Sequence, residues 1–184
     1  MTRFERVCLL AAAVMAAACG GEEDVEVAGP ELLQLGAEQV MVGVEHFMTR
    51  EGLRRAHLEA DTLYFLEEGS RVHLRRYTVD FFDEQGGSRS VLSARDGRYD
   101  LQTGDMEATD SVIVVDADDS QRLSTERLTY DAATDRLHSE VPFVMIQGRD
   151  TTRGEGFVTD PGLDSLEVTG PSFVSPPETD GGER

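Results

Sequence analysis

The residue with the most distinctive chemistry in this sequence is a cysteine that directly follows a short apolar run. Val7 to Ala18 is apolar and ends in three alanines, and Arg3 and Arg6 precede it. Such a run is too short to cross a hydrocarbon core as a helix, which needs about 20 residues. A basic start, a brief apolar stretch and small residues before a cysteine are typical of a secretory signal with a lipid-modified cysteine. We therefore expect cleavage after residue 18 and a lipid on Cys19 that anchors the protein to a membrane.

An ordinary signal peptide, cut near Ala18 with an unmodified cysteine after it, is the alternative. Ala16 stands where a lipoprotein signal usually has leucine. The other cysteine, Cys8, lies inside the expected signal, so the mature chain would keep one cysteine and form no internal disulfide, although an exported protein could have one.

Other residue types that could catalyse a reaction or bind a metal lack the necessary spacing. Asp116 to Ser120 begins like a calcium loop, but its sixth position is not glycine and its twelfth is not acidic, so we expect an acidic turn. We expect His57 and His73 on the solvated surface of strands. The sequence has no nucleophile elbow and no phosphate-binding loop. We expect neither catalytic residues nor a metal or cofactor, and the four histidines without ligand spacing are His46, His57, His73 and His138.

The charge of the chain excludes several classes of partner. Its formal net charge is −19 at pH 7, with 36 acidic residues against 17 basic ones. A polyanion repels nucleic acids and anionic bilayer surfaces. We therefore expect no binding to DNA or RNA and no peripheral membrane binding, so the lipid alone would hold the protein at the membrane.

Most of the chain shows strand signals. Short alternating runs are separated by clusters of Gly, Pro, Asp and Ser, and no window has a sustained helical apolar stripe. The segment from Gly20 to about Gly36 is acidic and interrupted by glycine and proline, as in a flexible tether. We expect a signal peptide at 1–18, a lipidated flexible tether at 19–38, an all-β domain at 39–174 and a disordered tail at 175–184.

The strand signals repeat at offsets of 34 and then 31 residues. Repetition on this scale indicates stacked units, none of which buries its apolar face alone. We expect about three short strands per unit, a degraded fourth copy from Gly154, and a rolled sheet with one apolar face inside. The aligned positions are Leu58-x-Ala60 with Phe65, Leu92-x-Ala94 with Tyr99, and Leu123-x-Thr125 with Tyr130, then Val72, Met106 and Leu137, then Val79-x-Phe81, Ile113-x-Val115 and Val144-x-Ile146.

This repeat resembles the LptA/OstA-like β-jellyroll repeats of lipopolysaccharide-transport proteins. Over about Val40 to Val168 the chain resembles the LptC family, the periplasmic component of the lipopolysaccharide export ABC transporter. The resemblance implies a single V-shaped β-jellyroll, a rolled antiparallel sheet whose apolar interior carries lipopolysaccharide acyl chains. It also implies that the sheet edges join the transporter's membrane subunits and an LptA-like jellyroll bridge protein. The resemblance implies a lipid-anchored place on the periplasmic face of the inner membrane. Relatives commonly have an uncleaved transmembrane anchor, whereas this chain has a lipidation signal instead, so the outer membrane remains an alternative location.

The resemblance assigns one set of residues to a lipid groove and another to a partner edge. The sequence leaves two alternatives open. The apolar set could simply pack into a closed core, because alternation does not distinguish a filled interior from an open one. The protein could also be a general periplasmic lipid carrier or a structural repeat lipoprotein without a transporter. The expected partner edge contains Gly154, Gly156, Phe157 and Val158. The expected lipid-groove lining consists of Leu58, Leu74, Tyr77, Val79, Phe81, Leu92, Met106, Ile113, Val115, Leu123, Val144 and Ile146.

Overall fold

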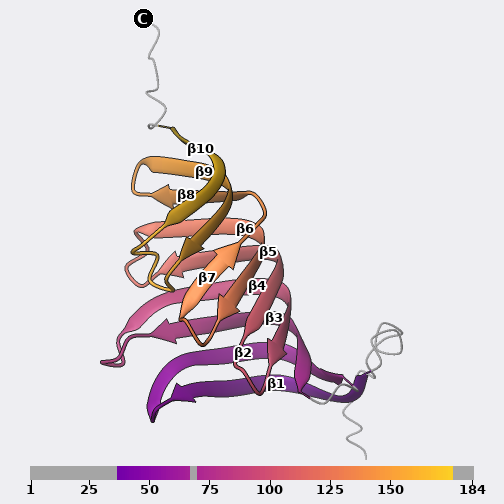
Figure 1. Ribbon diagram of the computed structural model, residues 1–184. Helices are drawn as coiled ribbons and strands as arrows, with labels where there is room; N and C mark the ends of the chain where they lie inside the picture. Colours follow the sequence, from indigo (N-terminus) through magenta and orange to yellow (C-terminus); the bar gives the residue numbers. More distant parts are fainter. Residues whose placement is uncertain (1–36, 67–69, 176–184) are drawn as a thin grey trace, which may run out of the picture. The chain divides into compact units, whose positions relative to one another are not determined.

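The computed structural model describes residues 37–66 and 70–175, with side chains through Gly170. Within these ranges the chain forms one antiparallel sheet of ten strands and no helix, so none could span a membrane (Figure 1). The expected all-β rolled sheet is confirmed, whereas the signal peptide, Cys19, nearly all of the tether and the tail from residue 176 lie outside the described residues. The strands are β1 (Ala37–Arg50), β2 (Leu53–Leu66), β3 (Arg71–Phe82), β4 (Ser88–Asp100), β5 (Met106–Asp116), β6 (Gln121–Asp131), β7 (Arg136–Ser139), β8 (Phe143–Gln147), β9 (Asp150–Thr159) and β10 (Glu167–Ser175).

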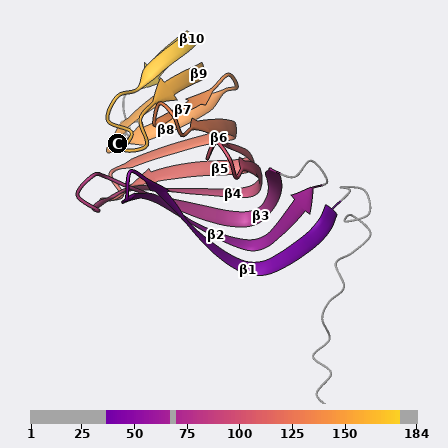
Figure 2. The same ribbon diagram turned by 60° about the horizontal axis from the view of Figure 1, so that its bottom comes forward.

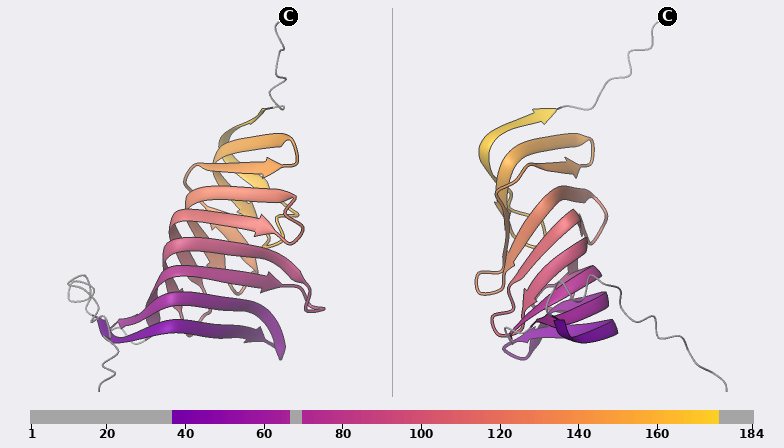
Figure 3. Two further views of the ribbon diagram at one scale, coloured as in Figure 1. Left: turned by 180° about the vertical axis from the view of Figure 1, so that it is seen from behind. Right: turned by 90° about the vertical axis from the view of Figure 1, so that its right-hand side faces the viewer.

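The strands are stacked in the order of the chain. Strands β1 to β6 pair consecutively, each antiparallel to the next. Strands β7 and β8 then pair with the two ends of β6, and β9 pairs with both of them. They therefore take the place of one strand that is interrupted at residues 140–142. Strand β10 pairs with β9, which makes β1 and β10 the two edges of the sheet (Figure 3).

The long strands bend near their middle, all on the same side of the stack (Figure 2). At this bend the pairing skips Gly43 and Asp61 between β1 and β2, and its register shifts between Thr109 and Val112 in β5. Gly43 and Arg76 have a positive φ, as do residues 110–111, which is typical of β-bulges that turn a strand. The bend divides the sheet into two leaves. The first leaf contains residues 44–60, 77–94, 112–125, 143–154 and 172–175, and the second contains 37–42, 62–66, 71–75, 96–109, 128–139 and 157–169.

The hydrophobic core lies between the two leaves. The Phe81 ring of the first leaf lies 5.0 Å from the Tyr130 ring of the second, and Phe143 and Phe157 pair at the same distance. Each fully buried Leu, Val or Phe contributes about 1.5–3 kcal/mol to folding. The apolar face inside the roll is therefore as predicted, and it forms one continuous cluster of buried residues from β2 to β9.

The repeating unit is two long bent strands rather than three short ones. Val72 and Val79, expected on separate strands, both lie on β3. A bend inside a strand breaks the alternation of side chains much as a turn does, and the sequence pattern does not separate the two cases. Only the third repeat has a true interruption, at residues 140–142 between β7 and β8.

The bends also contain different numbers of residues, which shifts the repeat alignment. In β3 the buried positions step from Leu74 to Tyr77, with Arg76 as the positive-φ residue. In β5 they step from Ala108 to Val112, across two positive-φ residues. A slip of one residue moves every following side chain to the other face of a strand. The offset of 34 residues therefore fails after the bend.

Candidate functional site

Eight of the predicted lining residues lie inside the roll. Each of them is at most 2% exposed, and they come from the neighbouring strands β2 to β6. They make a continuous apolar interior along the stack, and in this structure their side chains pack against one another. The eight are Leu58, Leu74, Tyr77, Val79, Phe81, Leu92, Met106 and Leu123.

The other four predicted lining residues, Ile113, Val115, Val144 and Ile146, were assigned to the wrong face. None of them is buried, and Ile146 is 44% exposed on the outside of the first leaf. Their neighbours occupy the interior instead. Residues 112–115 and 143–146 are entirely apolar, so alternation within either run does not indicate which residues face inward. The interior residues that the prediction missed in these runs are Val112, Val114, Phe143 and Met145.

Tyr77 places a polar group within the apolar interior. Its hydroxyl is buried and has no hydrogen-bond partner among the described residues. Burial, reinforced by the negative charges of Asp96 and Glu107, raises the pKa of Tyr77 well above its usual value, so the phenol stays protonated. The ring lies directly over Gly97, where a Cβ atom would collide with it. The interior therefore offers one hydrogen-bond donor that the protein itself does not use.

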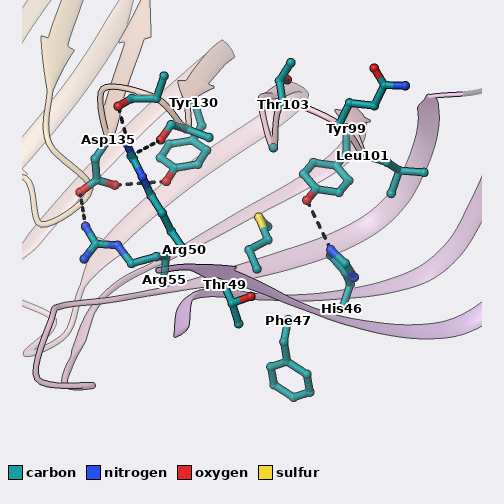
Figure 4. A pocket seen from close by; sticks show the side chains of 15 residues that line it. His46, Phe47, Thr49, Arg50, Arg55, Tyr99, Leu101, Thr103, Tyr130 and Asp135 are labelled. Atoms are coloured by element: carbon teal, nitrogen blue, oxygen red, sulfur yellow. Dashed lines mark hydrogen bonds and ion pairs between the residues drawn. The ribbon is translucent and has the colours of Figure 1, made fainter. Parts of the chain in front are cut away.

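A cavity of about 510 Å³ opens between the leaves at the β1 end of the roll (Figure 4). Met48 and Leu101 give it apolar walls. On one side the hydroxyl of Tyr99 lies 3.3 Å from the Nε2 atom of His46. On the other side Arg50 donates hydrogen bonds to the carbonyl oxygens of residues 132 and 133, at 2.9 and 3.1 Å. The cavity therefore has both apolar and polar walls, as a site for an amphiphile would.

Arginines of the first leaf meet aspartates of the second beside this cavity. We call this side, where the free ends of the leaves meet opposite the bend, the mouth, and we call Arg55, Arg89, Asp135 and Asp160 the mouth cluster. Arg89 pairs with Asp135 at 2.8 Å and also with Asp160, and Arg55 contacts Asp135 at 3.5 Å. The four side chains are 18–26% exposed. They form a partly buried ion-pair network that joins the leaves.

Hydrogen bonds keep both aspartates of the mouth cluster in place, and they help to keep Asp160 ionised. Burial alone would raise the pKa of Asp160, but hydrogen bonds from the backbone and hydroxyl of Ser165, together with the charge of Arg89, hold that pKa below its usual value. The hydroxyl of Tyr130 donates a hydrogen bond to Asp135 at 3.1 Å. Each carboxylate is therefore held by a hydrogen bond from its own leaf, independently of the arginines of the other leaf.

The predicted partner edge is not at an edge of the sheet. Val158 of β9 pairs with His138 on one side and with Glu167 on the other. Phe157 is fully buried. A Cβ atom on Gly156 would lie 2.8 Å from a backbone oxygen, and one on Gly154 would crowd the neighbouring strands, so these glycines permit close packing. The prediction was wrong because one more strand, β10, follows and covers β9.

The two observed edges are β1 and β10. Along β1, Val40, Met41 and Val42 are 37%, 43% and 80% exposed. An edge strand presents unpaired backbone N–H and C=O groups to which another strand can bind. The candidate docking strands are therefore the first and last of the sheet.

The remaining polar residues have structural contacts. Asp116 accepts hydrogen bonds from the Ser120 hydroxyl and the Gln121 backbone, so this segment is the acidic turn that we predicted. His57 stacks on the Phe47 ring, and His73 lies 3.0 Å from a carboxylate oxygen of Asp96. Both histidines lie on the outer face of the sheet, as expected, but their side chains are only 15% and 16% exposed, so they are less solvated than we predicted. No cluster of three potential metal ligands occurs in the described part of the chain.

Comparisons with known proteins identify one family. A family described as lipopolysaccharide-assembly, LptC-related, matches residues 9–169. No curated protein matches the chain. Among solved structures, LptH of Pseudomonas aeruginosa, an LptA-homologous periplasmic component of the lipopolysaccharide transport device, is similar at 14% identity. That match covers 72% of this chain and 82% of LptH, with a TM-score of 0.29. The family match spans β1 to β9 and the beginning of β10.

Proposed function

The chain belongs to the LptC-related family of lipopolysaccharide-assembly proteins, and we propose that it is the membrane-anchored periplasmic component of lipopolysaccharide export. A part in lipopolysaccharide transport follows from the family. In the proposal, the protein accepts lipid from the membrane subunits of an ABC transporter and holds the acyl chains between its leaves. It then passes the lipid to an LptA-like jellyroll bridge protein that is joined to an edge of the sheet.

The continuous apolar interior is the observation that carries this proposal. A lipid with several acyl chains cannot cross water freely, because each exposed methylene costs about 0.8 kcal/mol. Leu74, Val79 and Leu123 belong to a buried apolar surface that extends through the stack of strands. Such a surface could replace water along the path of the lipid. The cavity at the β1 end supports entry there, since residues of both leaves line it.

The edges support a role as a link between two proteins. Strand β1 is the first strand after the predicted tether in the sequence, so we assign it to the transporter. Strand β10 is then the edge for the bridge protein. Strand addition supplies backbone hydrogen bonds at each joint and would bring the apolar interiors of neighbouring proteins into line.

A photo-crosslinking residue on either face tests the proposed lipid path. At Val79 or Val114, inside the roll, it should capture lipopolysaccharide in cells with an active transporter. At Thr78 or Ile113, the adjacent positions on the outer face, it should capture little. Immunoblotting of crosslinked adducts for lipopolysaccharide is the measurement. Equal capture from both faces would contradict an oriented lipid path.

A further inference from the structure

The two leaves are held together at the mouth by contacts between strands that are distant in the sheet. Arg55 on β2 reaches Asp135 in the turn after β6, and Arg89 on β4 reaches both Asp135 and Asp160, which follows β9. The Ser90 hydroxyl adds a hydrogen bond to the carbonyl oxygen of residue 161. None of these contacts belongs to the ladder of the sheet. They can therefore break without unpairing any strand.

The opposite side of the roll has the features of a hinge. At the bend, the register shifts between Ser93 and Asp96 where β4 pairs with β5, and between Thr109 and Val112 where β5 pairs with β6. Residues 140–142 interrupt the next position of the stack. A line of interrupted pairing can change its angle with little loss of hydrogen bonds. The strand pairing is therefore interrupted along the bend, and ion pairs connect the two leaves on the opposite side, at the mouth.

The packed interior requires such an opening if it is to hold lipid. Phe81 and Tyr130 meet from opposite leaves with ring centroids 5.0 Å apart, and Leu74 and Leu92 are completely buried. A core packed to this extent has no room for an acyl chain. Lipid entry must therefore separate the leaves, and this separation must break the contacts at the mouth.

We propose that the mouth cluster is a releasable closure, whose Arg–Asp pairs hold the leaves shut until an amphiphile enters through the mouth. This inference rests on the proposed function, since it concerns how the lipid gains access. Ion pairs that remain partly exposed to water suit the task, because water can solvate the separated charges and the pairs are individually weak. The Arg50 and Arg55 side chains line the adjoining cavity. An anionic headgroup there could replace Asp135 as the partner of Arg55 and the carbonyl oxygens of residues 132 and 133 as the partners of Arg50.

A reversible covalent bridge tests whether the mouth must open. In the full chain, Arg55→Cys and Asp135→Cys are joined by a short disulfide-forming crosslinker, and a photo-crosslinking residue at Val79 reports the capture of fluorescent lipopolysaccharide. With the bridge in place, capture should fall close to background. Reducing the bridge should restore it. Equal capture by the bridged and reduced protein would overturn the proposal, because lipid would then enter without the mouth opening.

A second measurement follows the closure without any lipid. Spin labels at Glu84→Cys and Thr134→Cys, one on each leaf, report the separation of the leaves. Arg89→Gln should shift the population towards longer distances by roughly fivefold, about the effect expected for a partly buried ion pair. The matched control is Arg98→Gln, because Arg98 pairs with Glu107 within one leaf, and this variant should leave the distances unchanged.

The two measurements separate failure of the closure from failure of the proposed function. Unchanged distances in Arg89→Gln would overturn the closure whatever the lipid does. Capture that is absent even from the protein without added cysteines would overturn the transport function, and the role of the mouth cluster in lipid entry with it. The proposal stands only if the leaves respond to Arg89→Gln and the bridge blocks capture.

Discussion

Asp160 links the ends of the two leaves through a carboxylate with a lowered pKa. Because the pKa in the folded protein lies below the value in the unfolded chain, near 3.9, ionised Asp160 stabilises the fold above about pH 4. This contribution is lost as the pH falls through the lowered pKa. We expect Asp160→Asn to be less stable than the wild type at pH 7 by about 1 kcal/mol, and the difference to shrink towards pH 3.

Urea unfolding of both proteins at a series of pH values measures this difference. Asp61→Asn is the matched control, because Asp61 forms an exposed pair with Arg76 between neighbouring strands and should have a smaller effect. A deficit for Asp160→Asn that stayed constant down to pH 3 would show that the carboxylate acts through its shape rather than its charge.

Single residues also show where the sequence was informative about the interior. Leu58 and Ala60 alternate with polar neighbours, so only one face of this strand can point inward, and both residues are buried as expected. In the runs at 112–115 and 143–146 every residue is apolar, so either face of the strand could point inward. The choice depends on how many residues the preceding bend contains, and the residue types of Asp110 and Ser111 do not show that both of them adopt a positive φ.

At the scale of the strands, turns were predictable and bends were not. The clusters at residues 83–87 and 116–120 are turns in the structure, because Gly and Asp favour turn conformations and Asp side chains bond to the backbone there. Arg76 adopts a positive φ within β3 despite being neither glycine nor asparagine, so only the packing of the two leaves explains its conformation. The last strand, β10, was missed as a separate edge for a related reason: Gly170 and Pro171 interrupt its pattern.

Proline substitutions distinguish the edge strand from the strand that it covers. In β9, Val158→Pro should destabilise the fold, because both sides of this strand are paired. In β10, the backbone N–H groups of Val168 and Thr169 point to opposite sides of the strand, one towards β9 and one towards the free edge. Val168→Pro and Thr169→Pro each remove one of these two groups. One of these two variants should stay folded and lose binding to the bridge protein. Thermal melting followed by circular dichroism, with a pull-down of the bridge protein, gives both readouts.

The outcome for β10 has a clear alternative. If both β10 variants melt like the wild type and still bind the bridge protein, this edge is not the docking strand. Strand β1, with its exposed Met41 and Val42, would then be the edge to test.

For the whole molecule, the predicted lipid anchor would determine at which membrane the sheet is held. Cys19 lies outside the described residues, so its modification stays a prediction from the sequence. Cys19→Ala should abolish incorporation of a clickable fatty acid and leave the protein either unprocessed or released in soluble form. Labelling in cells followed by fractionation measures both effects. Unchanged labelling of the variant would contradict lipidation at this cysteine.

The position of β1 and β10 at opposite ends of one sheet has a consequence for symmetry. Because the two edges are different strands, a joint between β10 of one copy and β1 of another is heterologous. After such a contact, the joined pair still has one free β1 edge and one free β10 edge, to which further copies can add. Repeated addition generates an open-ended fibre, or a ring if the last copy meets the first, rather than a closed twofold dimer. The net charge of −19 on each copy opposes this growth through mutual repulsion. The two ends of the sheet are therefore different strands, and each can bind a different neighbouring protein. Because of its charge, a second copy of this protein is a poor candidate for binding at either end.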